Sequence, residues 1–215
     1  LALLLLALTA TWHAIFHLAR SPGAQPVAFA FGGEAKPTDY ARTMADGALL
    51  ALIASLGLAQ LSHETTPALT QLSCAALTFF AVAALPYRRV VPYLALGAGL
   101  IGLAVSGAPT TALLVCAGAG VLHALNPPAD HRHNPYPPRF DHAVAHRHVS
   151  AYLLGVMAVL LALIWSLDLW RWRLHTPAFN GESWHHLLTL LVWFTWPTWP
   201  LALITLWRWR RQILM

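Results

Sequence analysis

Long apolar runs separated by short polar segments dominate the chain. Several windows of 16 or more residues contain no Asp, Glu, Lys or Arg. A membrane-spanning helix needs about 20 predominantly apolar residues. The pattern therefore predicts an all-α, polytopic integral membrane bundle that forms a single transmembrane domain over residues 1–215. We expect seven spans, with six as the alternative count, at residues 1–18, 44–62, 67–86, 91–106, 109–126, 149–169 and 184–207.

The segments between these spans differ in length and character. Residues 19–43 and the histidine-rich residues 127–148 form the two long loops expected on one side, and residues 170–183 form a loop on the other. Span 91–106 is short for a full crossing. Pro197 and Pro200 interrupt the final span, and since proline cannot donate a backbone hydrogen bond we expect that helix to bend.

Small residues recur at helical spacing in the fourth and fifth spans. Ala95 with Gly99, Gly102 with Ser106, and the sequence AGAG at 117–120 are such sets. Small side chains let helix backbones approach closely in lipid. We interpret them as packing sites within this protein, with an oligomer interface as the alternative.

Composition supports a membrane location. The chain is 58% hydrophobic and only 10% charged, whereas soluble domains carry about 25% charged residues. Its formal net charge is +5, but the basic residues lie at the ends of apolar runs, where they meet lipid head groups. This placement argues against nucleic-acid binding and makes membrane lipids the expected partners.

The distribution of positive charge predicts the orientation. With the N-terminus outside and the C-terminus inside, 11 of the 13 Lys and Arg residues fall on the cytoplasmic side. Because positive charge favours that side, we expect this orientation. Arginine greatly outnumbers lysine, as in GC-rich bacterial genomes, and we expect a multi-pass protein of a bacterial inner membrane.

Histidines converge on the cytoplasmic side of this topology. One helical face at the end of span one carries two of them, span five ends with another, and the following loop carries five more. The candidate metal ligands are His13, His17, His123, His131, His133, His142, His146 and His148. Imidazole suits iron, copper and zinc, and a pair four residues apart in a helix can chelate one ion.

Two aspartates directly precede histidines in the loop. Asp130 and Asp141 are candidates to accept the free N–H of a ligating imidazole and so orient it. The alternative is that the loop histidines form a solvated, weakly basic surface facing anionic lipid, and that those in the spans hydrogen-bond between helices.

The histidine spacing resembles in part that of membrane di-iron desaturases and hydroxylases. HAIFH at 13–17 has the HxxxH spacing of their first box. HAVAHRH at 142–148 departs from their pattern as HxxxHxH, and no HxxHH box is present. The resemblance implies His-ligated iron and oxidation of a lipid, and the departures leave the catalytic residues unassigned.

Tryptophans concentrate near the C-terminus, where nine of the ten lie within residues 165–209. Trp193, Trp196 and Trp199 recur every third residue in the middle of the last predicted span. Such a stripe can stack a lipid tail or a flat cofactor, or can pack against a neighbouring helix or subunit. Haem held by histidines such as His185 and His186 is a weaker alternative to a single metal ion.

Three functions follow from these observations, and the sequence does not decide whether the protein is an enzyme. The first is a His-ligated, metal-dependent oxidative enzyme acting on lipid. The second is a non-catalytic subunit of a larger respiratory or photosynthetic membrane complex, packing lipid, haem or pigment. The third is a divalent-metal transporter. Transporters bury ionisable groups within the membrane, and the acid noted in the spans is Asp168, near the outer end of its helix.

Overall fold

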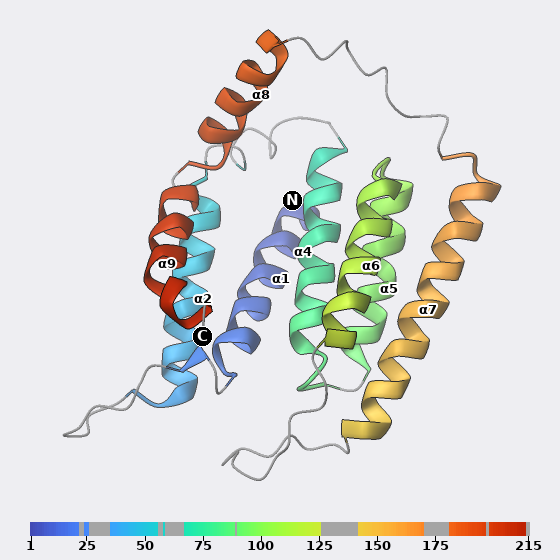
Figure 1. Ribbon diagram of the computed structural model, residues 1–215, viewed down its shortest axis with the longest axis horizontal. Coiled ribbons are helices and arrows are strands. Elements are labelled where there is room, and N and C mark those ends of the chain that lie inside the picture. Colours follow the sequence, from blue (N-terminus) through green and yellow to red (C-terminus); the bar gives the residue numbers. More distant parts are fainter. Residues whose placement is uncertain are drawn as a thin grey trace.

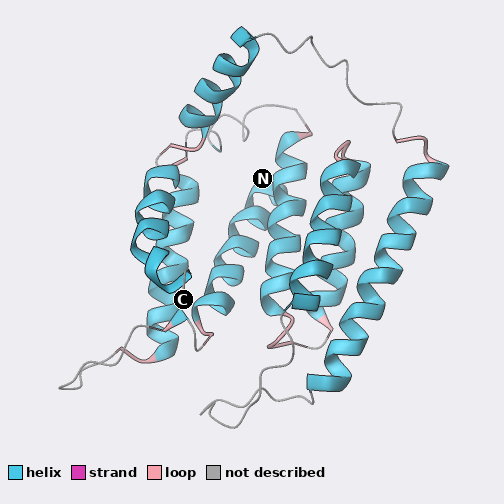
Figure 2. Ribbon diagram, viewed as in Figure 1, coloured by secondary structure: helices cyan, strands magenta, loops and turns pink. Residues whose placement is uncertain are grey.

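The structure is a computed structural model whose described part is helical throughout. It describes the backbone of residues 1–21, 24–25, 35–55, 58, 67–88, 90–125, 142–169, 181–196 and 198–213, and the side chains of these residues outside 142–147, 181–183 and 208–213. Within these ranges there is no strand (Figure 2). The predicted all-α class is therefore confirmed for the described residues.

The described helices follow the apolar runs in order. Their bounds are α1 Ala2–Ala19, α2 Pro37–Ile53, α4 Ala68–Ala84, α5 Val91–Val105, α6 Pro109–Leu125, α7 His142–Ser166, α8 Gly181–Phe194 and α9 Thr198–Ile213.

Helices α1 to α7 pack as neighbours in a row. Helix α1 contacts α2 and α4, α4 contacts α5, and α5, α6 and α7 contact one another. Helices that follow one another along the chain run in alternating directions, whereas α1 and α4, which pack side by side, run parallel (Figure 1). The C-terminal ends of α1 and α6 and the N-terminal end of α7 therefore lie at the same end of the bundle, the lower end in Figure 1.

The main core lies between α4, α5, α6 and α7. Its largest fully buried side chains include Leu96, Leu100 and Leu103 of α5 and Leu160 of α7. A second, smaller cluster joins α1 to α4 through Ala7, Ala10 and Ala76. The Ser73 hydroxyl donates to the Leu3 carbonyl over 2.8 Å and strengthens this contact.

Glycines set the close approach of α4 and α5. A Cβ at Gly99 would lie 2.9 Å from the Cys74 carbonyl oxygen and would clash with the Thr78 hydroxyl, and one at Gly102 would lie 2.6 Å from the Cys74 sulfur. These positions confirm the predicted internal packing. Among the described residues, nothing lies within 4 Å of such a Cβ at Gly118 or Gly120 of the AGAG sequence, so packing within this chain is not found there and the oligomer interface stays a prediction.

Helix length and composition support fewer spans than the seven predicted. Among the described residues, α1 and residues 148–166 of α7 are long and apolar enough to cross a membrane. Helices α8 and α9 make a third candidate if they count as one span, although an 87° bend separates them. Helices α4, α5 and α6 coincide with three other predicted spans and are apolar, but they are shorter than the candidate spans.

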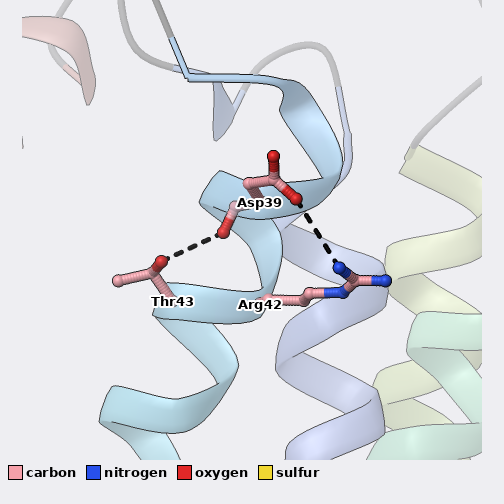
Figure 3. A network of polar contacts seen from close by, with 3 residues as sticks. All are labelled: Asp39, Arg42 and Thr43. Atoms are coloured by element: carbon pink, nitrogen blue, oxygen red, sulfur yellow. Dashed lines mark hydrogen bonds and ion pairs between the residues drawn. The ribbon is translucent and has the colours of Figure 1, made fainter.

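Two boundaries differ from the prediction for identifiable reasons. Helix α2 begins at Pro37, inside the predicted loop 19–43, because proline at the first helical turn and Asp39 beside the positive helix N-terminus favour a start there. Figure 3 shows the Asp39 carboxylate beside Arg42, and their charged atoms lie 3.6 Å apart. The backbone carbonyl of Asp39 accepts a hydrogen bond from the Thr43 hydroxyl. The predicted span 184–207 is broken after Phe194 rather than merely bent.

Candidate functional site

The histidine-bearing segments lie at the same end of the bundle but in two separate places. His13 and His17 belong to α1, which packs on α2 and α4, whereas His123 belongs to α6 and His148 to α7. Helices α4 and α5 stand between α1 and the α6–α7 pair (Figure 1). The four described histidines therefore lie on helix ends at the same end of the bundle, as predicted. The helices that carry them do not all contact one another.

His17 is the most unusual polar side chain of the described core. It is only 4% exposed, and neither ring nitrogen has a hydrogen-bond partner among the described residues. Its ring stacks on Tyr87, with centroids 5.1 Å apart and planes 19° apart, and meets Phe16 edge-on at 5.8 Å. Buried imidazole nitrogens are ordinarily hydrogen-bonded or bound to an ion, so this ring needs a ligand or a water.

His13, one helical turn earlier, is exposed and partly satisfied. Its Nδ1 lies 2.9 Å from the Thr9 carbonyl oxygen. A carbonyl only accepts, so Nδ1 donates, and in the neutral ring Nε2 then keeps its lone pair. A backbone hydrogen bond of this kind fixes the tautomer of many metal-binding histidines.

Phe80 of α4 connects the two histidines. Its ring centroid lies 6.0 Å from that of His13 and 6.1 Å from that of His17. Because α4 supplies this contact, the environment of the pair depends on the packing of α1 against α4. The pair can supply two imidazole ligands, but the described side chains include no group of three or more His, Cys, Asp or Glu that could hold a metal.

Basic and aromatic residues border the pair. The Arg20 guanidinium lies 5.3 Å from the Phe16 ring centroid and 5.5 Å from that of Tyr87. Burial raises the pKa of the Tyr87 phenol above its ordinary value, and the charge of Arg20 partly offsets that rise. The charges of Arg20 and Arg88 also act on the ring of His17.

The other predicted ligands are only partly described. His123 is half-buried near the end of α6, and His148 is exposed on α7. His142 and His146 lie in the first turns of α7, which begins inside the stretch 127–148 predicted as a loop, and their side chains are outside the described set. His131, His133, Asp130 and Asp141 also lie outside the described residues.

The tryptophan stripe does not follow one continuous helix. Trp193 lies in α8, Trp199 lies in α9, and Trp196 lies in the break between them. The rings of Trp196 and Trp199 contact each other, with centroids 6.0 Å apart and planes 61° apart. All three are exposed, by 64%, 49% and 36% in sequence order. The expected stripe is thus an exposed aromatic surface around a bend.

Sequence reasoning overlooked one acid. Asp46 lies inside the predicted span 44–62, and its carboxylate accepts a 2.7 Å hydrogen bond from the Trp12 indole N–H of α1. Trp12 in turn meets His13 edge-on at 4.9 Å. An ionisable residue in an apolar run is itself a signal of function, and that signal could have identified Asp46.

Comparisons with protein-family models, with curated proteins and with solved structures found no match to this chain.

Proposed function

We propose that this chain is a multi-pass protein of a bacterial inner membrane, with seven spans, its N-terminus outside and its C-terminus in the cytoplasm. The asymmetry of Lys and Arg along the sequence supports this orientation. In this topology the end of the bundle that carries His13 and His17 faces the cytoplasm.

Its proposed function is to bind a transition-metal ion through His13 and His17. The observation that carries the proposal is the burial of His17, one helical turn from His13, with two ring nitrogens that have no hydrogen-bond partner among the described residues. The hydrogen bond of His13 to Thr9 supports it, because it leaves Nε2 as the metal-binding atom. Water would supply the remaining ligands.

The chemistry of the donors limits the ion. Two neutral imidazoles suit iron, copper or zinc rather than calcium or magnesium, which prefer oxygen ligands. Iron or copper is the ion expected of an oxidative enzyme acting on lipid, whereas zinc alone would indicate a structural site or a transported ion.

Metal analysis of the full-length protein tests the proposal. The protein, purified in mild detergent through a tag without histidine, is loaded separately with Fe²⁺, Cu²⁺ or Zn²⁺, and bound metal is measured by mass spectrometry. We expect about one tightly bound ion per chain for one of these metals and its loss in His17→Phe, which keeps an aromatic ring in the buried position.

Two controls make the result specific. His186→Ala removes an exposed histidine of α8 and should leave the tight ion in place. Helical content from circular dichroism shows that His17→Phe still folds. Absence of a stoichiometric ion in the native protein under all three loadings, or its full retention in folded His17→Phe, would overturn the assignment.

A second candidate is a non-catalytic subunit of a larger membrane complex. The aromatic surface of Trp193, Trp196 and Trp199 favours it, because exposed tryptophans are typical of both lipid and protein contacts. Purification from native membranes tests it: partner chains in a defined ratio are expected, and a pure, stable monomer contradicts it.

A further inference from the structure

Arg20 is held between two helices by aromatic rings. Phe16 precedes it by one turn on α1, and Tyr87 follows the end of α4, so its guanidinium lies against rings from both elements at 5.3 and 5.5 Å. Contact with aromatic faces orients the planar guanidinium while leaving its N–H donors available. The Arg20 side chain is therefore anchored although the residue is exposed.

A second arginine belongs to the same place. Arg88 directly follows Tyr87, whose ring contacts Arg20, and is exposed. The backbone N–H of Arg88 bonds to the Ala84 carbonyl at 3.0 Å, which continues the last turn of α4. Two cations thus lie at the ends of the packed helices α1 and α4, Arg20 in contact with the Tyr87 ring and Arg88 next to Tyr87 in the chain, and an anion bound there would reduce their mutual repulsion.

Neither cation has an acidic partner among the described residues. Arg42, which lies at the start of α2, contrasts with them because Asp39 partners it at 3.6 Å (Figure 3). The chain therefore balances Arg42 with its own carboxylate, and for Arg20 and Arg88 the described part of the chain supplies none.

We propose that Arg20, Arg88 and Tyr87 bind the phosphate of an anionic phospholipid headgroup. Their position fits the headgroup layer, because both α1 and α4 are apolar and end just before these residues. Arginine forms paired hydrogen bonds with phosphate oxygens, and tyrosine is typical of the membrane interface. This proposal does not depend on the metal site.

The surroundings favour a lipid over a free phosphate ion. Leu18 of α1 and Phe79 of α4 are each 43% exposed within the apolar helices that lead to the site. Such side chains offer contact area to an acyl chain, which inorganic phosphate does not have. A lipid can therefore use the charged and the apolar surfaces together, whereas phosphate can use only the charged one.

Thermal unfolding of the full-length protein in neutral detergent tests the site. Phosphatidylglycerol, phosphatidylcholine and inorganic phosphate are titrated separately into the wild type, the double variant Arg20→Gln/Arg88→Gln and the control Arg42→Gln. We expect phosphatidylglycerol to stabilise the wild type and Arg42→Gln at the same concentration, and the double variant to need about tenfold more, since it loses charge-assisted hydrogen bonds.

Each alternative result is decisive. Equal stabilisation of the double variant and the wild type by phosphatidylglycerol would overturn the site. Equal effects of phosphatidylcholine and phosphatidylglycerol would show that charge is not recognised, and equal effects of inorganic phosphate and phosphatidylglycerol would replace the lipid by a free anion. If the double variant does not fold, Arg88→Gln alone provides the same readout, because the ring contacts of Arg20 remain.

Discussion

Helix α1 and the α8–α9 pair both place aromatic rings three or four residues apart, yet these side chains lie in different environments. On α1, His17 is 4% exposed and lies against Tyr87, which follows α4. On α8, every described side chain from Trp184 to Phe194 is exposed. Among the described residues, α1 has a closely packed neighbour of small residues, whereas α8 has none.

The difference shows what turns a polar pattern into a site. Ala7 and Ala10 of α1 meet Ala76 of α4, so the two backbones approach closely and the larger rings at the end of α1 become enclosed. Helices α8 and α9 carry large side chains such as Leu190, Trp193 and Leu203 on their exposed surfaces. These side chains therefore lack a packed neighbour among the described residues.

The largest loss of stability is expected from a substitution in the closely packed contact between α4 and α5. Gly99→Val places side-chain atoms where α4 already has the Thr78 hydroxyl and the Cys74 carbonyl, so the helices must separate. We expect a loss of about 3 kcal/mol in the free energy of unfolding, measured by detergent-induced unfolding in micelles.

Gly118→Ala is the matched control for this substitution. A Cβ there meets nothing within 4 Å, and alanine favours a helix over glycine. We expect no loss and a gain of up to about 1 kcal/mol. Similar destabilisation by both substitutions would contradict the assignment of close packing to Gly99.

Phe80→Ala gives the next largest effect. Phe80 is half-buried, belongs to the packing of both core clusters and contacts the rings of His13 and His17. We expect a cost of about 2 kcal/mol in the free energy of unfolding, below that of a fully buried phenylalanine. Phe79→Ala, at the exposed neighbouring position, should cost less than about 0.5 kcal/mol, and equal costs would contradict the burial of this site.

Hydropathy predicted where most helices lie along the chain but not which helices pack against one another. The apolar runs located α1, α4, α5 and α6 closely, because each run becomes one helix, whereas α7 begins at His142 rather than at 149 because its first turns are polar. The start of α2 was missed, since the first turns of that helix are polar and its signals are Pro37 and Asp39 instead. Span counting also treated α8 and α9 as one helix, although two prolines lie at their junction.

The candidate site was predictable only in part. Helices alternate in direction along the chain, so the C-terminal ends of α1 and α6 lie at the same end of the bundle. The order of the apolar runs in the sequence was enough to predict this. The packing of α4 beside α1 depends on how the side chains of the two helices fit together. The spacing of apolar residues in the sequence does not predict this fit. The burial of His17 and the exposure of His13 follow from that choice, as does the contact of Arg20 with Tyr87.

Trp12→Phe sharpens the comparison by removing one polar link of α1. Phenylalanine keeps the ring but not the indole N–H, which donates to the Asp46 carboxylate over 2.7 Å. We expect a loss of about 1 kcal/mol in the free energy of unfolding. Asp46→Asn retains an acceptor oxygen and should cost less, so a larger cost for Asp46→Asn would point to a role for its charge beyond this hydrogen bond.

The smallest effect is expected on the exposed side of the comparison, at Trp196. Its ring contacts Trp199 and is 49% exposed, so Trp196→Ala should change the free energy of unfolding of the isolated protein by less than about 0.5 kcal/mol. The same substitution, measured in native membranes, distinguishes lipid from protein contact. A surface that faces lipid alone tolerates it there too, whereas a surface that packs on another subunit loses co-purifying chains. A cost as large as that of Phe80→Ala in the isolated protein would mean that α8 and α9 pack within the bundle, and the contrast with α1 would fail.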